Sequence, residues 1–96
     1  MKYTKEQLVE LSHELRKSDK PERITLMLNF ISSLKNTPLT IKSNANMHVY
    51  IRQVDENISI DLWPTTIRGS FNIDGKNTTY TTAFEILNTL NDLYGE

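Results

Sequence analysis

The spacing of apolar residues changes twice along this chain, and this change limits its fold more than any other feature. Before Pro38 the apolar residues recur at helical spacing, and from Leu39 to Tyr80 they tend to recur at every second position. After Ala83 the helical spacing returns. These periods indicate the order ααββββα, or ααβββα if the last hairpin is irregular. The sequence therefore predicts a single α+β domain over residues 1–96, with an antiparallel sheet and helices packed on one face.

Two helices are predicted in the first part of the chain. Thr4 and Gln7 have the spacing of a capping box, which places the first helix over residues 5–17. Pro21 lies near the start of the second helix, which continues to about Lys35. The apolar stripes of these helices are Leu8, Leu11 and Leu15, and then Ile24, Met27, Leu28, Ile31 and Leu34.

Short polar segments divide the strand region. A short strand at 39–41 and a turn at 43–46 come first. The tight turn at 55–57 joins two alternating runs into a hairpin, and 74–75 is an Asp-Gly pair that is typical of a second tight turn. The last helix is predicted from a second capping-box pair and an apolar stripe: Thr82 and Glu85, then Ala83, Ile86, Leu87, Leu90 and Leu93.

Length and composition restrict the class of protein. Ninety-six residues, of which 38% are hydrophobic, suit one globular domain with a modest core. The chain has no cysteine, which excludes disulfides, thiolate metal sites and cysteine nucleophiles. No stretch approaches the roughly 18 apolar residues of a membrane helix, and the first residues lack the apolar core of a signal peptide. We therefore expect a cytoplasmic protein with no membrane partner.

The net charge of −1 is unevenly distributed. Residues 1–42 hold eight Lys and Arg against five Asp and Glu, whereas residues 43–96 hold three against seven. The helical part is thus mildly basic and the sheet part acidic. This balance disfavours a general nucleic-acid binder, whose affinity comes mainly from neutralising phosphates. It suits a basic protein surface, or a site that normally holds nucleic acid, as the partner.

The central hairpin has two chemically different faces. Its core-facing residues are predicted to be Met47, Val49, Ile51, Ile58, Ile60 and Leu62. The opposite face then carries His48, Tyr50, Arg52, Ser59, Asp61 and Trp63. This second face gathers two aromatic rings, a guanidinium and a carboxylate, and it is our candidate site.

Two registers preserve this alternation, and the sequence does not choose between them. In the first, Arg52 lies opposite Asp61, and Trp63 is opposite Tyr50. In the second, Tyr50 lies opposite Asp61, and Trp63 is opposite His48. Both registers bring the same groups into one patch.

Trp, Tyr and Arg are enriched among the residues that dominate binding energy at protein interfaces. The predicted binding residues are therefore His48, Tyr50, Arg52, Asp61 and Trp63, with the acidic Asp55 and Glu56 of the neighbouring turn. A purely structural explanation is also open. The indole next to Pro64 could cover an edge of the core or pack under a loop, and Tyr50 and Arg52 could simply stack on each other.

Other constellations give weaker indications of chemistry. His13 and His48 lie on different elements without carboxylates at metal-ligand spacing, so we predict no metal site and no cofactor. Asp61 and His48 could imitate half of an acid–base pair, but no nucleophile or oxyanion donor is identifiable, so we expect no catalytic residues and no enzyme. A basic cluster that could contact phosphate comprises Arg16, Lys17, Lys20 and Arg23, with Arg68 farther along the chain.

The segment IDLWPTT, residues 60–66, resembles a strand end found in small uncharacterised proteins of bacteriophages and prophages. Their pattern is I-D-F-W-P-[ST]-T, usually followed by G-K-W. Here Leu62 replaces the Phe, and Ile67-Arg68-Gly69 replaces Gly-Lys-Trp, so that a second exposed aromatic residue is missing. The resemblance implies a small, single-domain phage accessory protein that binds and inhibits a host machine.

These observations together predict a non-enzymatic protein-binding module. We interpret it as a phage-encoded inhibitor that docks on a host protein complex, of bacterial defence or nucleic-acid processing, and blocks it in the host cytoplasm. The alternative is an accessory nucleic-acid-binding protein, in which Trp63 and Tyr50 stack on bases and the Arg and Lys residues contact phosphates. The chain could be a monomer or a homodimer, because exposed strand edges can pair.

Overall fold

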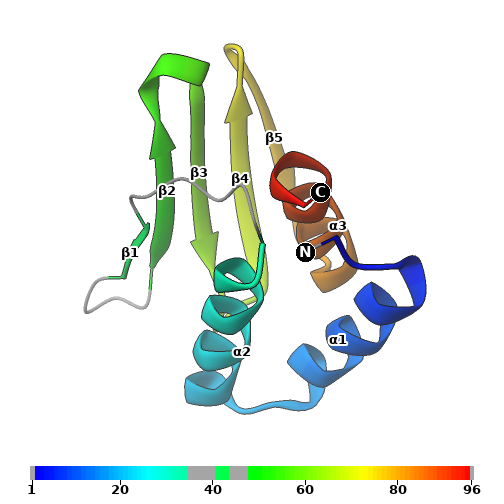
Figure 1. Ribbon diagram of the computed structural model, residues 1–96. Coiled ribbons are helices and arrows are strands. Elements are labelled where there is room, and N and C mark those ends of the chain that lie inside the picture. The colour runs from blue at the N-terminus through cyan, green and yellow to red at the C-terminus, as the bar shows by residue number, and fades with distance from the viewer. Residues whose placement is uncertain (1, 35–40, 44–47, 96) are drawn as a thin grey trace.

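The computed structural model describes residues 2–34, 41–43 and 48–95, and it contains three helices and one antiparallel sheet (Figure 1). The strands follow one another in the sheet in the order β1-β2-β3-β4-β5. In chain order the elements are α1 Lys5–Lys17, α2 Lys20–Ser32, β1 Ile41–Ser43, β2 Val49–Gln53, the 3-10 turn η1 Val54–Glu56, β3 Ile58–Trp63, β4 Arg68–Ile73, β5 Lys76–Tyr80 and α3 Ala83–Tyr94.

The predicted fold class is confirmed. The chain is α+β, the sheet is antiparallel, and the helices lie over one of its faces (Figure 1). The structure has five strands, one more than the longer of the two predicted orders. The short strand predicted at 39–41 corresponds to β1, which spans Ile41–Ser43, so Ser43 belongs to this strand and not to the predicted turn. Leu39 and Met47, and most of the turn predicted at 43–46, lie outside the described residues.

The helices begin at the predicted caps. The Thr4 hydroxyl accepts a hydrogen bond from the Gln7 backbone N–H, and the Gln7 side chain accepts one from the Thr4 backbone, which is a complete capping box. The Asp19 carboxylate caps α2 by accepting from the backbone of Glu22. α2 ends at Ser32, before the predicted end at Lys35.

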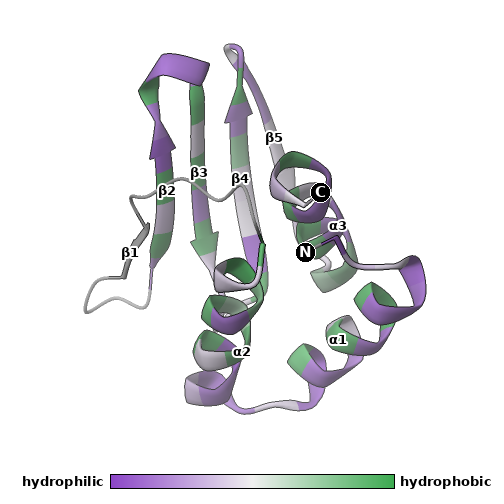
Figure 2. Cartoon of the chain, viewed as in Figure 1, coloured by the Kyte–Doolittle hydropathy of each residue, from purple (hydrophilic) through white to green (hydrophobic). Residues whose placement is uncertain are grey.

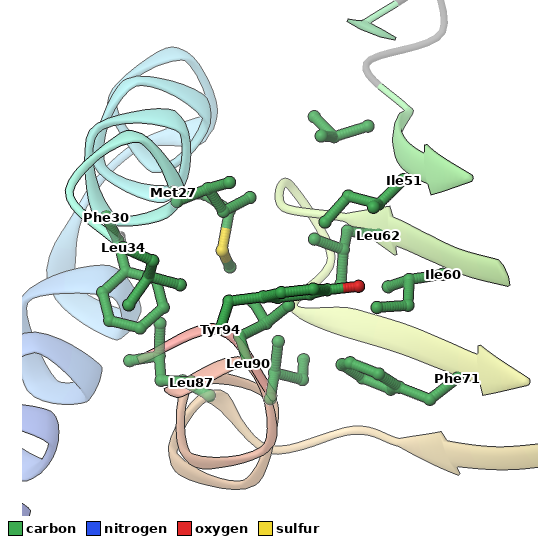
Figure 3. Close-up of a cluster of buried hydrophobic side chains, with 14 of the residues drawn as sticks. Met27, Phe30, Leu34, Ile51, Ile60, Leu62, Phe71, Leu87, Leu90 and Tyr94 are labelled. Carbon is green, nitrogen blue, oxygen red and sulfur yellow. The ribbon is translucent and has the colours of Figure 1, made fainter. Parts of the chain in front are cut away.

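The core lies between the helices and the sheet (Figure 3). On β2 and β3 the predicted alternation is confirmed, since Val49, Ile51, Ile60 and Leu62 are all fully buried. The bands of hydrophobic and hydrophilic residues along these strands show the same alternation (Figure 2). The buried apolar residues of the helices are Leu8, Leu15, Met27, Phe30, Ile31, Ala83, Ile86, Leu87, Leu90 and Tyr94, and Leu34, two residues beyond the end of α2, belongs to the same core.

The buried stripe of α2 differs from the predicted one. Phe30 is buried, with 2% of its surface exposed, whereas Ile24 and Leu28 are only partly buried. The Phe30 ring packs against Tyr3, with ring centroids 4.9 Å apart. Tyr3, in the segment that precedes α1, therefore packs on Phe30, a contact that helical spacing alone does not reveal.

The β3–β4 turn explains why a proline follows the only tryptophan. Pro64 is buried at the second position of a tight turn, in which the Thr66 backbone N–H donates to the Trp63 carbonyl oxygen. The missing N–H of Pro64 is not needed there. Ile67 closes the turn with a left-handed backbone, φ 53°. This conformation is costly for a β-branched residue and natural for glycine.

The residue that follows Arg68 is on the core face of the sheet, which corrects one expectation. Gly69 lies opposite Leu62, and a Cβ atom placed on it would be 3.1 Å from the Leu62 side chain and 3.3 Å from that of Ile86. An aromatic residue at this position would point into the core under α3. The glycine at position 69 therefore does not remove an aromatic residue from the exposed face.

None of the helices in the described part of the chain has the length and apolar character needed to cross a membrane.

Tyr94 links α3 to the sheet, and its burial makes the stability of the fold sensitive to pH in the alkaline range. Its ring lies within the core, with only 3% of its surface exposed (Figure 3). Its hydroxyl donates to the Gln53 side-chain oxygen at 3.3 Å. Burial raises the pKa of the Tyr94 phenol from 10.0 to about 12, because the phenolate form is poorly solvated there. The folded protein therefore retains this proton at a pH where the unfolded chain has lost it.

We expect this difference to reduce stability between pH 10 and about pH 12. In that range the unfolded state binds fewer protons than the folded state, so the free energy of unfolding falls as pH rises, by up to about 2–3 kcal/mol. Urea unfolding of the wild type and of Tyr94→Phe at pH 8, 10 and 12 measures the effect. Tyr94→Phe leaves every other ionisable group in place, so an equal fall in both proteins would contradict the prediction.

Candidate functional site

The face of the sheet opposite the helices carries the predicted site. Tyr50 is paired with Asp61, so the structure adopts the second of the two registers. Continuing this register places His48 beside Trp63, and their rings are stacked, with centroids 4.9 Å apart and planes at 8°. We call the group His48, Tyr50, Arg52, Asp61, Trp63 and Arg68 the aromatic cluster.

Trp63 lies between a neighbour on each adjacent strand. His48, just before β2, stacks on one side of the indole, and the Arg68 guanidinium carbon, on β4, lies 5.6 Å from the ring centroid. Because β2 and β4 flank β3, these two groups approach the indole from the strands on either side of it. Trp63 is partly buried, and its indole N–H forms no hydrogen bond with any residue in the described ranges. The edge of the indole is therefore the part available to a partner.

A single carboxylate oxygen holds the cluster together. Asp61 Oδ1 accepts a hydrogen bond from His48 Nε2 at 2.7 Å and from Arg52 Nη2 at 2.8 Å. The side chains of His48 and Asp61 are 20% and 25% exposed. Because the Asp61 carboxylate already accepts from two donors, we interpret it as the group that positions His48 and Arg52 and not as a free general base.

Arg52 is fixed from several directions. Besides its bond to Asp61, its Nη1 atom donates to the backbone oxygen of Ile60 at 2.9 Å. Its guanidinium lies over the Tyr50 ring, 4.8 Å from the centroid, which is a cation–π contact. The Tyr50 ring also contacts His48, with centroids 5.3 Å apart. The Tyr50 hydroxyl forms no hydrogen bond within the described residues.

The open face extends onto β4 and β5, which the sequence analysis did not include. Its next positions are Ser70 and Asn72 on β4, and Asn77 and Thr79 on β5. Ser70 is paired with Asp61, so this polar strip borders the aromatic cluster directly. Applying period-two alternation beyond the turn at 64–67 would have found it, since Arg68 is the first residue of the same row.

Asp55 and Glu56 do not lie beside the tryptophan. They belong to the exposed η1 turn, at the opposite end of β3 from Trp63. Six strand residues separate the two ends, which is roughly 20 Å. These acidic side chains therefore border the Arg52 end of the open face and cannot contact a partner group seated on Trp63.

The basic cluster predicted for nucleic acid divides into structural and exposed members. Arg23 donates to three backbone oxygens, those of Leu15 at 2.9 Å, Arg16 at 3.3 Å and Thr65 at 2.6 Å. Arg23 thereby ties the end of α1 to α2 and to the β3–β4 turn. The exposed members are Arg16, Lys17 and Lys20, in the helix layer, and Arg68, on the open sheet face. These cations do not form one continuous row with Trp63.

The fold and the site together define a class: a small α+β domain whose open antiparallel sheet face presents an ordered cluster of aromatic and charged side chains. Comparisons of the chain with protein-family models, with curated proteins and with solved structures find no match.

The stacking of His48 on the only tryptophan can be tested by fluorescence. In His48→Ala one face of the indole is uncovered, so we expect stronger quenching by acrylamide and emission at longer wavelength than in the wild type. His13→Ala is the matched control, because the other histidine lies on α1. Unchanged quenching in His48→Ala would contradict the stacked arrangement.

The structural part of Arg23 can be separated from its charge. Arg23→Met removes three hydrogen bonds to backbone oxygens, and we expect the free energy of unfolding to fall by about 1–3 kcal/mol. Lys20→Met removes the same charge from an exposed position and should change it by less than about 0.5 kcal/mol. Urea unfolding measures both, and equal losses in the two variants would refute this assignment.

Proposed function

We propose that this protein is a non-enzymatic protein-binding module that docks through the aromatic cluster. The observation that carries the proposal is the position of Trp63, whose ring is held by His48 and Arg68 on a sheet face that no described element covers. Buried Trp, Tyr and Arg anchors supply most of the binding energy at protein interfaces. Side chains that are already fixed lose less conformational entropy when they bind.

The groups left available suit a protein partner. The indole N–H and the Tyr50 hydroxyl are unpaired within the described residues, and Arg68 is exposed with no ion pair there. They can bond to backbone or side-chain oxygens at an interface. The adjoining strip of Ser70 and Thr79 is small and polar, so a flat partner surface can approach closely.

Base stacking, which the alternative function requires, is less well supported. A nucleobase binds to the open face of an aromatic ring, whereas His48 already stacks on the indole and the Arg68 guanidinium lies 5.6 Å from its centroid. Asp61 adds a carboxylate next to the ring. The exposed Arg68 is the observation that favours nucleic acid, because its guanidinium could pair with a phosphate.

More specifically, we propose that the protein is a phage-encoded inhibitor that blocks a bacterial defence or nucleic-acid-processing complex. This proposal is supported by the resemblance of residues 60–66 to phage and prophage proteins, and by the small size of the chain. Its mechanism would be steric, since a docked domain of this size can cover a functional surface of a larger complex.

The double variant Trp63→Ala with Tyr50→Ala tests the docking surface. We expect it to lose the proteins that the tagged wild type retains from a bacterial lysate, as identified by mass spectrometry. Circular dichroism and thermal melting must show that the variant is folded. The matched control is Asn72→Ala with Asn77→Ala, on the same face but farther from Trp63, and it should retain the partner.

Two results would count against protein docking. A folded double variant that captures the same proteins in the same amount would remove the aromatic cluster from the interface. Binding of single-stranded DNA or RNA that falls steeply between 50 and 200 mM salt would support the alternative function, because phosphate contacts release counterions.

A further inference from the structure

A cleft lies in the helix layer, on the other side of the sheet from the aromatic cluster. Its volume is about 550 Å³, within the range of small-molecule sites. It lies between α1, the β3–β4 turn and the segment that joins β5 to α3. We call it the α1 cleft, and its lining residues are Val9, Ser12, His13, Arg16, Arg23, Thr66, Ile67, Thr81, Thr82, Ala83 and Phe84.

The ionisable groups that line the α1 cleft are all basic. Arg23 is fixed by its three bonds to backbone oxygens, so its cation is already in position before any ligand arrives. Arg16 and His13 extend from α1 and are exposed. Within the described residues neither arginine forms an ion pair. An anion in the cleft would therefore meet cations that are not neutralised by a carboxylate.

The remaining lining gives the cleft an apolar part and a polar part. Val9, Ile67 and Phe84 supply apolar surface, and Ile67 and Phe84 pack against the core behind it. Thr81 is exposed, and its hydroxyl forms no hydrogen bond within the described residues. This combination suits a molecule with an apolar group at one end and an anionic group at the other.

The start of α3 does not account for this site. The Thr82 hydroxyl accepts from the Glu85 backbone N–H at 3.4 Å and donates to the Glu85 carboxylate at 2.6 Å. The helix is thus capped by its own residues, and the Glu85 carboxylate accepts from the Thr82 hydroxyl. Attraction for an anion must come from Arg16, Arg23 and His13 on the other wall.

We propose that the α1 cleft binds a small organic anion, in which one phosphate or carboxylate group is attached to an apolar body. The anionic group lies against Arg16 and Arg23, and the apolar body lies against Val9 and Phe84. This site is independent of the aromatic cluster, so it stands whether or not the open face binds a protein.

Phenyl phosphate, benzoate and inorganic phosphate serve as probes, followed by amide chemical shifts of the isotope-labelled full chain. We expect phenyl phosphate to shift the amides of the cleft residues and to bind roughly tenfold more tightly than inorganic phosphate, because only the phenyl ring buries apolar surface. Comparing phenyl phosphate with benzoate then distinguishes a phosphate from a carboxylate preference.

Matched variants separate the two halves of the ligand. Arg16→Gln should weaken phenyl phosphate and inorganic phosphate alike, by about 5- to 10-fold, because both lose the same charged contact. Val9→Ser should weaken the binding of phenyl phosphate but not that of inorganic phosphate. Because Val9 is exposed on α1, we expect this variant to fold. Lys17→Gln, which removes an equal charge from α1 outside the cleft, should change neither affinity.

The proposal is overturned by any of three results. The first is the absence of amide shifts in the cleft when phenyl phosphate is added. The second is that phenyl phosphate binds no more tightly than inorganic phosphate. The third is that Lys17→Gln weakens binding as much as Arg16→Gln. The last two results would show that surface charge alone attracts the anion.

Discussion

The register between β2 and β3 is the constraint on which the rest of this structure depends. Val49, Ile51, Ile60 and Leu62 are completely buried, so a slip of β2 by one residue against β3 would move Val49 and Ile51 to the open face and turn their polar neighbours toward the core. A slip of two residues would keep the core and still change the surface. The observed register pairs Tyr50 with Asp61, and this pairing allows His48 to stack on Trp63.

The sequence predicts the elements and the two faces of the sheet well, because both follow from local periodicity. It does not predict the register, since Arg52 or Tyr50 can face Asp61 with the same alternation. That choice depends on the η1 turn, where Asn57 adopts a left-handed backbone, φ 55°. It also depends on the carboxylate of Asp61, which accepts from both His48 and Arg52.

Local periodicity does not place residues whose partners are distant in sequence. Arg23 was predicted as part of a phosphate-binding cluster, yet it bonds to the backbone of Thr65, 42 positions away. Phe30 is buried because Tyr3 packs on it, and Gly69 leaves room for Ile86 of α3. Spacing along the chain reports which face a residue occupies, but not which long-range contact fills that face.

The position of Trp63 outside the core is the strongest physical reason to assign it a binding function. The core is built from aliphatic residues with Phe30, Phe71 and Tyr94, and it leaves no buried polar side-chain atom unpaired within the described residues. The fold therefore does not need the indole to fill its interior. Pro64 ends the strand immediately after Trp63, so the ring lies at the last paired position of β3. A large aromatic side chain that is ordered by its neighbours, but not needed for the core, retains apolar surface that a partner can bury.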